Sequence, residues 1–172
     1  MAMNLLVIFY NQKSVAQSNL NHSIYLELGG SGGLYSLNYD LIGININGFK
    51  IGARLGLEFL SEGRQGTTVD VYIPFTVNFM YAFGNKHHIE LGVGPQIGSY
   101  EIKNVITATD IGLIRKTEVL GNATFGYRFQ NPDGGFMFRV FYSPFFYQEG
   151  VQFRYEHWAG VSIGYTFKKK GE

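Results

Sequence analysis

The chain has 172 residues, with 14 basic and 13 acidic side chains and no cysteine. This length suggests one domain, the near-neutral charge excludes the basic footprint of a nucleic-acid-binding protein, and the lack of cysteine excludes disulfides and thiolate metal sites. The 23 Gly, 15 Phe and 12 Tyr residues favour strands over helices. No run of about 18 apolar residues is present, which excludes a membrane-spanning helix but not a transmembrane barrel.

The first predicted element is an export signal. Residues 5–10 form a short apolar core, and the tripeptide at 14–16 resembles a small-residue cleavage site. No Lys or Arg precedes the core, which a truncated start would explain. We expect residues 1–16 to be a signal peptide and residues 17–172 to form the folded domain. The alternative is a disordered or strand-like N-terminal extension.

An alternation of apolar and polar residues then recurs along the chain, with the period of two that strands require. It is longest at 69–83, where every odd-numbered residue is apolar. Turn signals separate the alternating segments at Asn47-Gly48, 84–86 and 131–135. The predicted strands, in chain order, are 22–30, 35–41, 49–60, 69–83, 89–98, 118–129, 136–146 and 153–167.

The connections set the number of strands. The Gly-rich stretch 29–33 interrupts the first alternation. The apolar residues occupy even-numbered positions before it and odd-numbered positions after it. We interpret it as a tight hairpin, with one bulged strand over 22–41 as the alternative. Longer connections are expected at about 102–115 and near 147–152. With the hairpin there are eight strands and no helix, so the chain alternates direction and both ends lie on the same side.

The apolar face holds more Phe, Tyr, Leu and Val residues than the interior of an eight-stranded barrel can accommodate. The opposite face carries Gly, Ser, Thr and charged residues, which such a lumen could hold. A two-sheet sandwich would instead leave Gly-rich strands exposed. We therefore predict an all-β fold, an eight-stranded antiparallel up-and-down transmembrane β-barrel whose apolar face contacts lipid.

Aromatic residues of the apolar face gather at one end of the predicted strands. The short turns lie at this end, called the turn end below, and most longer loops lie at the opposite loop end. An aromatic girdle at the membrane interface is typical of transmembrane barrels. The predicted girdle consists of Tyr39, Phe49, Tyr81, Phe83, Tyr127, Phe129, Phe136, Phe138, Tyr165 and Phe167.

The segment 160–167 alternates hydrophobic residues and closes on Tyr165-Thr166-Phe167. It resembles the C-terminal signal that the outer-membrane assembly machinery reads. Over about 22–167 the chain resembles the small Gram-negative outer-membrane β-barrels of the OmpA/OmpX-like class. The resemblance implies an outer-membrane location with periplasmic termini, and it implies membrane lipids and the assembly machinery as partners. We expect a monomer.

Charged residues of both signs occupy the alternate strand positions that face the predicted lumen, which we call the inward parity. Because unpaired charge is costly in a narrow lumen, they predict a hydrogen-bonded ion-pair network. Lys50, Arg54 and Glu58 are spaced to line one wall. The predicted network consists of Glu27, Lys50, Arg54, Glu58, Asp70, Glu90, Glu118, Arg128, Arg139, Arg154 and Glu156, and Asp40 shares their parity.

A largely plugged lumen predicts a structural anchor or surface protein that acts through its loops. One alternative is a narrow channel or binding site for small polar solutes, and another is a soluble lipocalin-like ligand-binding barrel. No arrangement of Ser, His and acid at the loop end suggests an enzyme, so no catalytic residue and no cofactor is expected. His87-His88 lacks an acidic pair for a metal site. Gly92, Gly94 and Gly98 are expected to make room for large lumen side chains.

Overall fold

The computed structural model describes residues 21–61, 69–107, 110–149 and 151–168, so the expected signal peptide lies outside the described residues. Within these ranges the chain forms ten strands and one short 3-10 helix. No helix in this part of the chain is long and apolar enough to cross a membrane. The elements are β1 (Asn21–Gly29), η1 (Gly30–Gly32), β2 (Tyr35–Ile46), β3 (Phe49–Ser61), β4 (Val69–Ala82), β5 (His87–Thr107), β6 (Asp110–Gln130), β7 (Gly135–Tyr142), β8 (Phe145–Glu149), β9 (Gln152–Glu156) and β10 (Ala159–Lys168).

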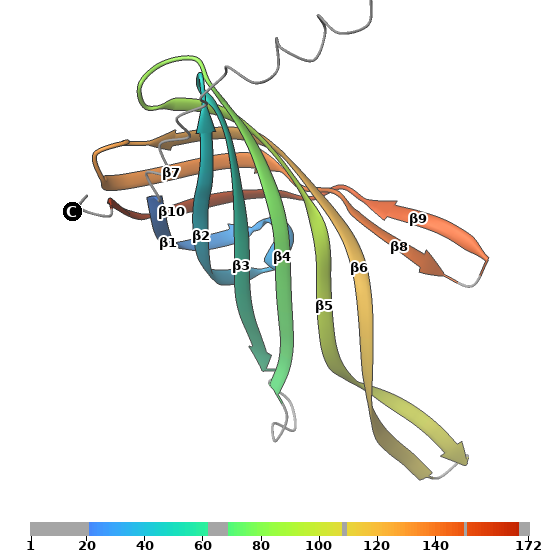
Figure 1. The fold of residues 1–172 in the computed structure, drawn as a ribbon. Coiled ribbons are helices and arrows are strands. Elements are labelled where there is room, and N and C mark those ends of the chain that lie inside the picture. The colour runs from blue at the N-terminus through green and yellow to red at the C-terminus, as the bar shows by residue number, and fades with distance from the viewer. Residues whose placement is uncertain (1–20, 62–68, 108–109, 150, 169–172) are drawn as a thin grey trace, which may run out of the picture.

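Eight of these strands close into a barrel (Figure 1). From β1 to β7 each strand pairs antiparallel with the next, and β10 pairs with both β7 and β1, which closes the ring. Closure leaves the ring without an unpaired sheet edge. The predicted eight-stranded antiparallel up-and-down barrel is confirmed.

The Gly-rich stretch joins β1 to β2 in a hairpin. Gly29, Gly30 and Gly33 have φ values of 70°, 74° and 114°, which side chains with a Cβ rarely adopt. The backbone N–H of Gly29 donates to the carbonyl oxygen of Leu34 at 2.8 Å, and the two strands pair along their length beyond it. Residues 22–41 therefore form two strands, and the alternative of one bulged strand is wrong.

The connection predicted at about 102–115 is instead mostly strand. β4 pairs with β5 as far as Val71 opposite Ser99, whereas β5 and β6 continue pairing to Thr107 opposite Asp110. Beyond Ser99, β5 pairs with β6 and no longer with β4. As a result the β5–β6 hairpin projects well past the barrel at the loop end (Figure 1).

The last two predicted strands are each divided in two. The segment 136–146 breaks between β7 and β8 at Ser143-Pro144, and 153–167 breaks between β9 and β10. Pro144 has no N–H to donate to a ladder, and β8 pairs with β6 at only two positions. The β8–β9 hairpin therefore bends away from the barrel wall (Figure 1).

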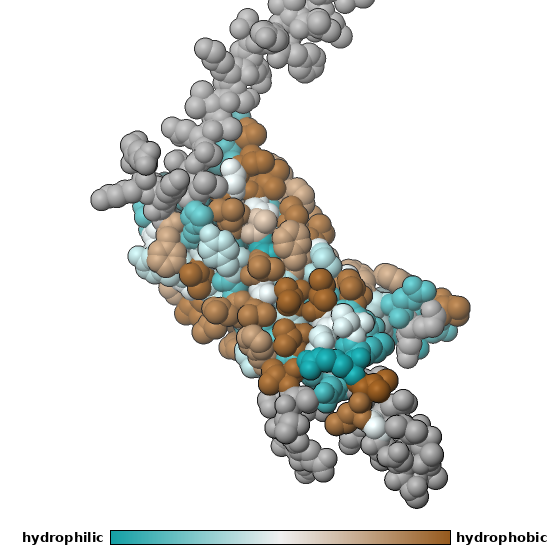
Figure 2. Space-filling model, turned by 60° about the horizontal axis from the view of Figure 1, so that its bottom comes forward, coloured by the Kyte–Doolittle hydropathy of each residue, from teal (hydrophilic) through white to brown (hydrophobic). Residues whose placement is uncertain are grey.

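Side chains along the ring strands alternate between lumen and exterior. In β1, Leu26 is 57% exposed, whereas its neighbours Tyr25 and Glu27 are buried in the lumen. Figure 2 shows hydrophobic side chains over most of the visible barrel wall. The exterior is apolar and the lumen is lined mainly by polar and charged groups. This is the inverse of what a soluble lipocalin-like barrel requires, and that alternative is not supported.

Candidate functional site

Three arginines and three carboxylates occupy the middle of the lumen, and we call these six residues the lumen network. None of their side chains is more than 3% exposed. Each lies at an inward position of its strand, where the period of two turns the neighbouring apolar residues outward. The members come from six strands and are Glu27 on β1, Asp40 on β2, Arg54 on β3, Glu90 on β5, Arg128 on β6 and Arg139 on β7.

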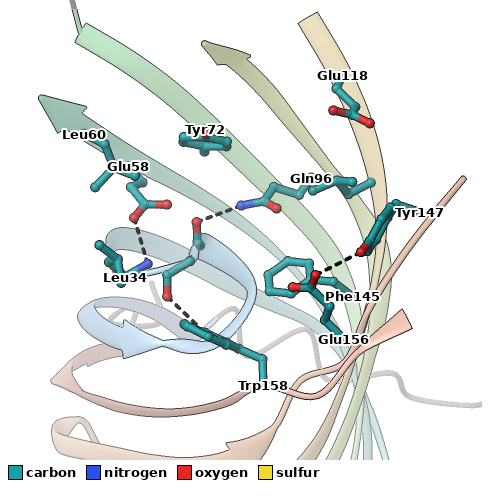
Figure 3. A pocket seen from close by; sticks show the side chains of 13 residues that line it. Leu34, Glu58, Leu60, Tyr72, Gln96, Glu118, Phe145, Tyr147, Glu156 and Trp158 are labelled. Atoms are coloured by element: carbon teal, nitrogen blue, oxygen red, sulfur yellow. Dashed lines mark hydrogen bonds between the residues drawn. The ribbon is translucent and has the colours of Figure 1, made fainter. Parts of the chain in front are cut away.

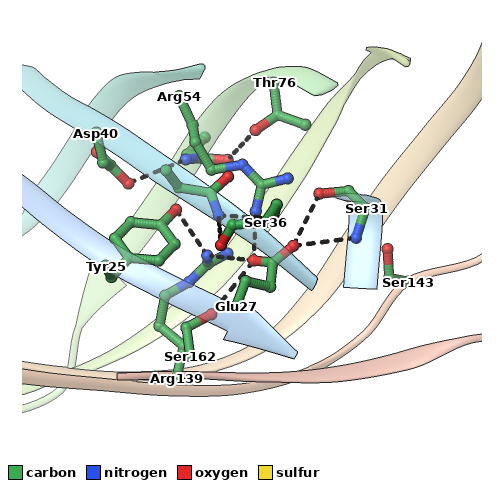
Figure 4. Close-up of polar contacts among 12 residues, drawn as sticks. Tyr25, Glu27, Ser31, Ser36, Asp40, Arg54, Thr76, Arg139, Ser143 and Ser162 are labelled. Carbon is green, nitrogen blue, oxygen red and sulfur yellow. Dashed lines mark hydrogen bonds and ion pairs between the residues drawn. The ribbon is translucent and has the colours of Figure 1, made fainter. Parts of the chain in front are cut away.

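Ion pairs join four members of the lumen network, Arg54, Glu27, Arg139 and Glu90, in a continuous path. Figure 4 shows the part around Arg54, Glu27 and Arg139. Arg54 Nη1 lies 2.8 Å from Glu27 Oε2, and Arg139 Nη1 lies 3.2 Å from the same oxygen. Arg139 Nη2 lies 2.6 Å from Glu90 Oε1 and its Nη1 donates to the hydroxyl oxygen of Tyr25 at 2.8 Å. Glu27 and Glu90 are therefore both held by Arg139.

Arg128 extends the path across the lumen. Its Nε lies 2.5 Å from Glu90 Oε2, and its Nη2 lies 2.5 Å from Asp40 Oδ2. Arg128 is on β6 and Asp40 is on β2, and in the closed ring three strands separate these two in either direction. The pair Arg128–Asp40 therefore connects opposite walls.

The two remaining ring strands contribute neutral partners. Ser162 on β10 donates to Glu27 Oε2 at 3.2 Å, and Asn78 Nδ2 on β4 donates to Asp40 Oδ2 at 3.4 Å. All eight strands of the ring thus contact the same connected set of side chains. In a low-dielectric interior such a network resists separation of its charges because each charge is hydrogen-bonded.

The three residues expected to line one wall lie on β3 as predicted but do not contact each other. Lys50 lies toward the turn end, with Nζ 2.8 Å from Nε2 of His88. Glu58 lies at the loop end, where Oε1 accepts from the backbone N–H of Leu34 at 2.9 Å. Only Arg54 belongs to the lumen network. His88, which the sequence analysis did not place in the lumen, is fully buried there, and its even-numbered position, shared with Glu90, could have indicated this.

The structure corrects four other predicted members of the network. Asp70 lies near the loop end and is only partly buried, and Glu118 accepts a hydrogen bond from the hydroxyl of Tyr100 at 2.5 Å. Arg154 and Glu156 are exposed on β9. Because β9 leaves the ring, parity counted along one continuous strand does not place these two residues in the lumen.

The predicted girdle residues have exposed or partly exposed side chains. Nine lie close to the ends of their strands at the turn end, and Tyr39 lies opposite Ile24 near the start of β1. His87, which the girdle prediction missed, packs 5.9 Å from Phe83 between ring centroids and contacts the Tyr127 hydroxyl through Nδ1 at 2.7 Å. Its odd-numbered position, shared with the outward-facing Ile89 and Leu91, could have indicated this.

A pocket of about 420 Å³ opens at the loop end, and we call it the loop-end pocket (Figure 3). Part of its wall is the segment at η1. Gln96 Nε2 donates to the carbonyl oxygen of Gly32 at 2.7 Å, and Trp158 Nε1 donates to that of Gly33 at 3.1 Å. These two bonds tie β5 and the start of β10 to the β1–β2 connection. Three residues predicted for the lumen line this pocket: Glu58, Glu118 and Glu156.

No protein-family model and no curated protein matches the chain. Solved structures do match. The N-terminal β-barrel domain of Pseudomonas aeruginosa OprF aligns with a TM-score of 0.52 and 13% identity, covering 88% of this chain and 99% of that one. Ail, the attachment invasion locus protein of Yersinia pestis, aligns with a TM-score of 0.53 and 12% identity, covering 87% and 99%. Neisserial surface protein A aligns with a TM-score of 0.52 and 11% identity, covering 88% and 98%.

These identities are low, so the likeness concerns the fold. The chain has the fold of small outer-membrane β-barrels, and the resemblance to the OmpA/OmpX-like class is confirmed at that level.

Proposed function

We propose that this chain is an outer-membrane protein that serves as a membrane anchor and presents its loop end at the cell surface. The observation that carries the proposal is the lumen network, which links six strands and crosses the barrel from β2 to β6. A lumen crossed by buried ion pairs suits a rigid scaffold better than a conduit, because moving a solute through it would separate charges in a low-dielectric interior.

The exterior supports the membrane location. Large apolar side chains such as Leu26, Leu57 and Val119 are 57%, 38% and 63% exposed, which is favourable only against lipid. The structural neighbours are outer-membrane barrels. We infer that the turn end and both termini face the periplasm. Membrane lipids are then the surrounding partner, the assembly machinery inserts the chain, and the barrel is a monomer.

The extended hairpins support the surface role. The β5–β6 hairpin and the β8–β9 hairpin both leave the ring at the loop end (Figure 1). On β9, Phe153 is 73% exposed and Tyr155 is 60% exposed, so the hairpin presents aromatic groups beyond the barrel. One structural neighbour is named for attachment, and an attachment role for these hairpins would be in keeping with this exposure.

Single-channel recording in planar lipid bilayers tests the closed lumen. We expect no reproducible openings from the wild-type chain. The double variant Asp40→Ser with Arg128→Ser removes the pair that connects opposite walls without changing the net charge, and it should introduce small openings. Reproducible wild-type openings that change on Arg54→Ala would contradict the anchor proposal and support a narrow channel.

A further inference from the structure

The loop-end pocket presents hydrogen-bond acceptors and aromatic rings. Three polar side chains around it use an N–H or O–H within the protein: Gln96 and Trp158 donate to backbone oxygens of the η1 segment, and Tyr147 donates to Glu156 Oε1 at 2.9 Å. These bonds hold the wall in place. They leave carboxylate oxygens as the main polar groups available to a ligand.

Glu58 carries the strongest of these acceptors. Its side chain is 1% exposed, and Oε1 accepts from the backbone N–H groups of Leu34 and Tyr35 at 2.9 and 3.2 Å. Oε2 has no hydrogen-bond partner among the residues that the structure describes. In Figure 3 the carboxylate lies at the pocket wall beside Leu34 and near Tyr72. A buried carboxylate oxygen without a donor is costly, so a donor that reaches it from the pocket would be bound favourably.

The charge of the pocket selects the sign of the ligand. Glu58, Glu118 and Glu156 come from β3, β6 and β9 and lie around the pocket, whereas none of the described lining residues is Lys or Arg. Outside the lining, Lys116 has a half-exposed side chain with Nζ 3.7 Å from Glu118 Oε2. The pocket therefore attracts cations and repels anions.

The aromatic lining selects the kind of cation. Tyr72, Phe145, Tyr147 and Trp158 line the pocket together with leucines. Aromatic faces attract ammonium groups, and leucines suit an apolar ligand body. No group of three or more His, Cys, Asp or Glu in the described part of the chain could hold a metal ion. These features favour an organic cation over a metal.

We propose that the loop-end pocket binds small organic cations, with ammonium groups directed to the carboxylates and an apolar body between the aromatic side chains and leucines. The pocket volume of about 420 Å³ lies within the range of small-molecule sites, about 300–1,000 Å³. An aliphatic diamine suits it best, because the carboxylates come from separate strands around an apolar space. This site does not depend on whether the lumen conducts.

Fluorescence titration of the folded protein in detergent micelles tests this site. Trp158 is the single tryptophan of the chain, so its emission reports on the pocket alone. Cadaverine is the probe, and pentanediol is a neutral molecule of the same length. We expect a saturable change with cadaverine and none with pentanediol. A missing response to cadaverine, or equal responses to both, would overturn the proposal.

Variants locate the bound cation. Glu58→Gln keeps an oxygen for the Leu34 N–H and should weaken cadaverine binding about tenfold or more, the usual effect of losing a hydrogen bond to a charged group. If Glu58→Gln does not fold, the double variant Glu118→Gln with Glu156→Gln tests whether the pocket carboxylates hold the cation, because it changes only side chains near the surface. Glu101→Gln removes one charge from the β5–β6 hairpin outside the pocket lining and should leave binding unchanged. Equal affinity in all these variants would overturn the proposal.

Discussion

Replacing Glu90 by Gln tests how strongly the lumen network holds the barrel together. Glu90 contacts Arg139 at 2.6 Å and Arg128 at 2.5 Å, and its side chain is 3% exposed. The substitution keeps the shape but leaves three arginines against two carboxylates. Removing one partner of a buried ion pair costs about 3–5 kcal/mol. Arg128 keeps Asp40 and Arg139 keeps Glu27, so we expect a loss of about 3 kcal/mol in the free energy of unfolding, at the lower end of that range.

Urea titration of the barrel folded into lipid vesicles measures this loss, with Trp158 emission and gel migration as independent readouts. Glu101→Gln is the matched control, because it makes the same chemical change outside the lumen and should cost no more than about 1 kcal/mol. Adding Arg128→Gln to Glu90→Gln rebalances the charge, so the double variant should lose less than the sum of the two single variants. If Glu90→Gln costs no more than the control, the lumen network does not stabilise the fold.

Three further predictions concern the wall and the whole barrel. Leu26→Arg puts a charge on the outer face, where Leu26 is 57% exposed, and should cost about 2–4 kcal/mol if this position is near the bilayer midplane; unchanged stability in vesicles would contradict a lipid-facing wall. Gly94→Ala should destabilise the barrel by about 1–3 kcal/mol, because the added Cβ would lie 2.0 Å from the carbonyl oxygen of Phe75, whereas Gly43→Ala meets no atom within 4 Å and should be neutral in the same urea titration. On a denaturing gel the folded chain should migrate differently before and after boiling, and identical migration would argue against a detergent-resistant barrel.

Much of the fold follows from local geometry. A strand turns successive side chains to opposite faces, so the pattern around Leu26 and Glu27 already separates exterior from lumen. The turn at Asn47-Gly48 was also predictable from its residues alone. Asn47 and Gly48 have φ values of 50° and 87°, as the dipeptide predicts. The departure of the β8–β9 hairpin from the ring could not be predicted from local patterns, because whether a strand stays in the ring depends on neighbours that are distant in the sequence.

The glycines of β5 also include one whose role was predictable from the sequence and one whose role was not. Gly92 makes room for the side chains of Thr124 and Asn78, as its inward parity predicts. Gly94 has the same parity, but it allows the backbone of β4 to approach, between the paired positions Pro74–Gln96 and Val77–Val93. The parity of a residue is a property of its own strand, whereas the distance to the next strand is set by the sheet.

The sequence by itself determined that the strands have one apolar and one charged face, because this requires only the period of two within each strand. Only the tertiary structure decided which charges meet. Asp40 and Arg128 are 88 positions apart and form a pair because ring closure sets β2 opposite β6. Arg154 and Glu156 have the same parity as the lumen charges but lie on a strand that leaves the ring. Electrostatic attraction depends on the distance between two charges, and the distance between charges on different strands is set only when the barrel closes.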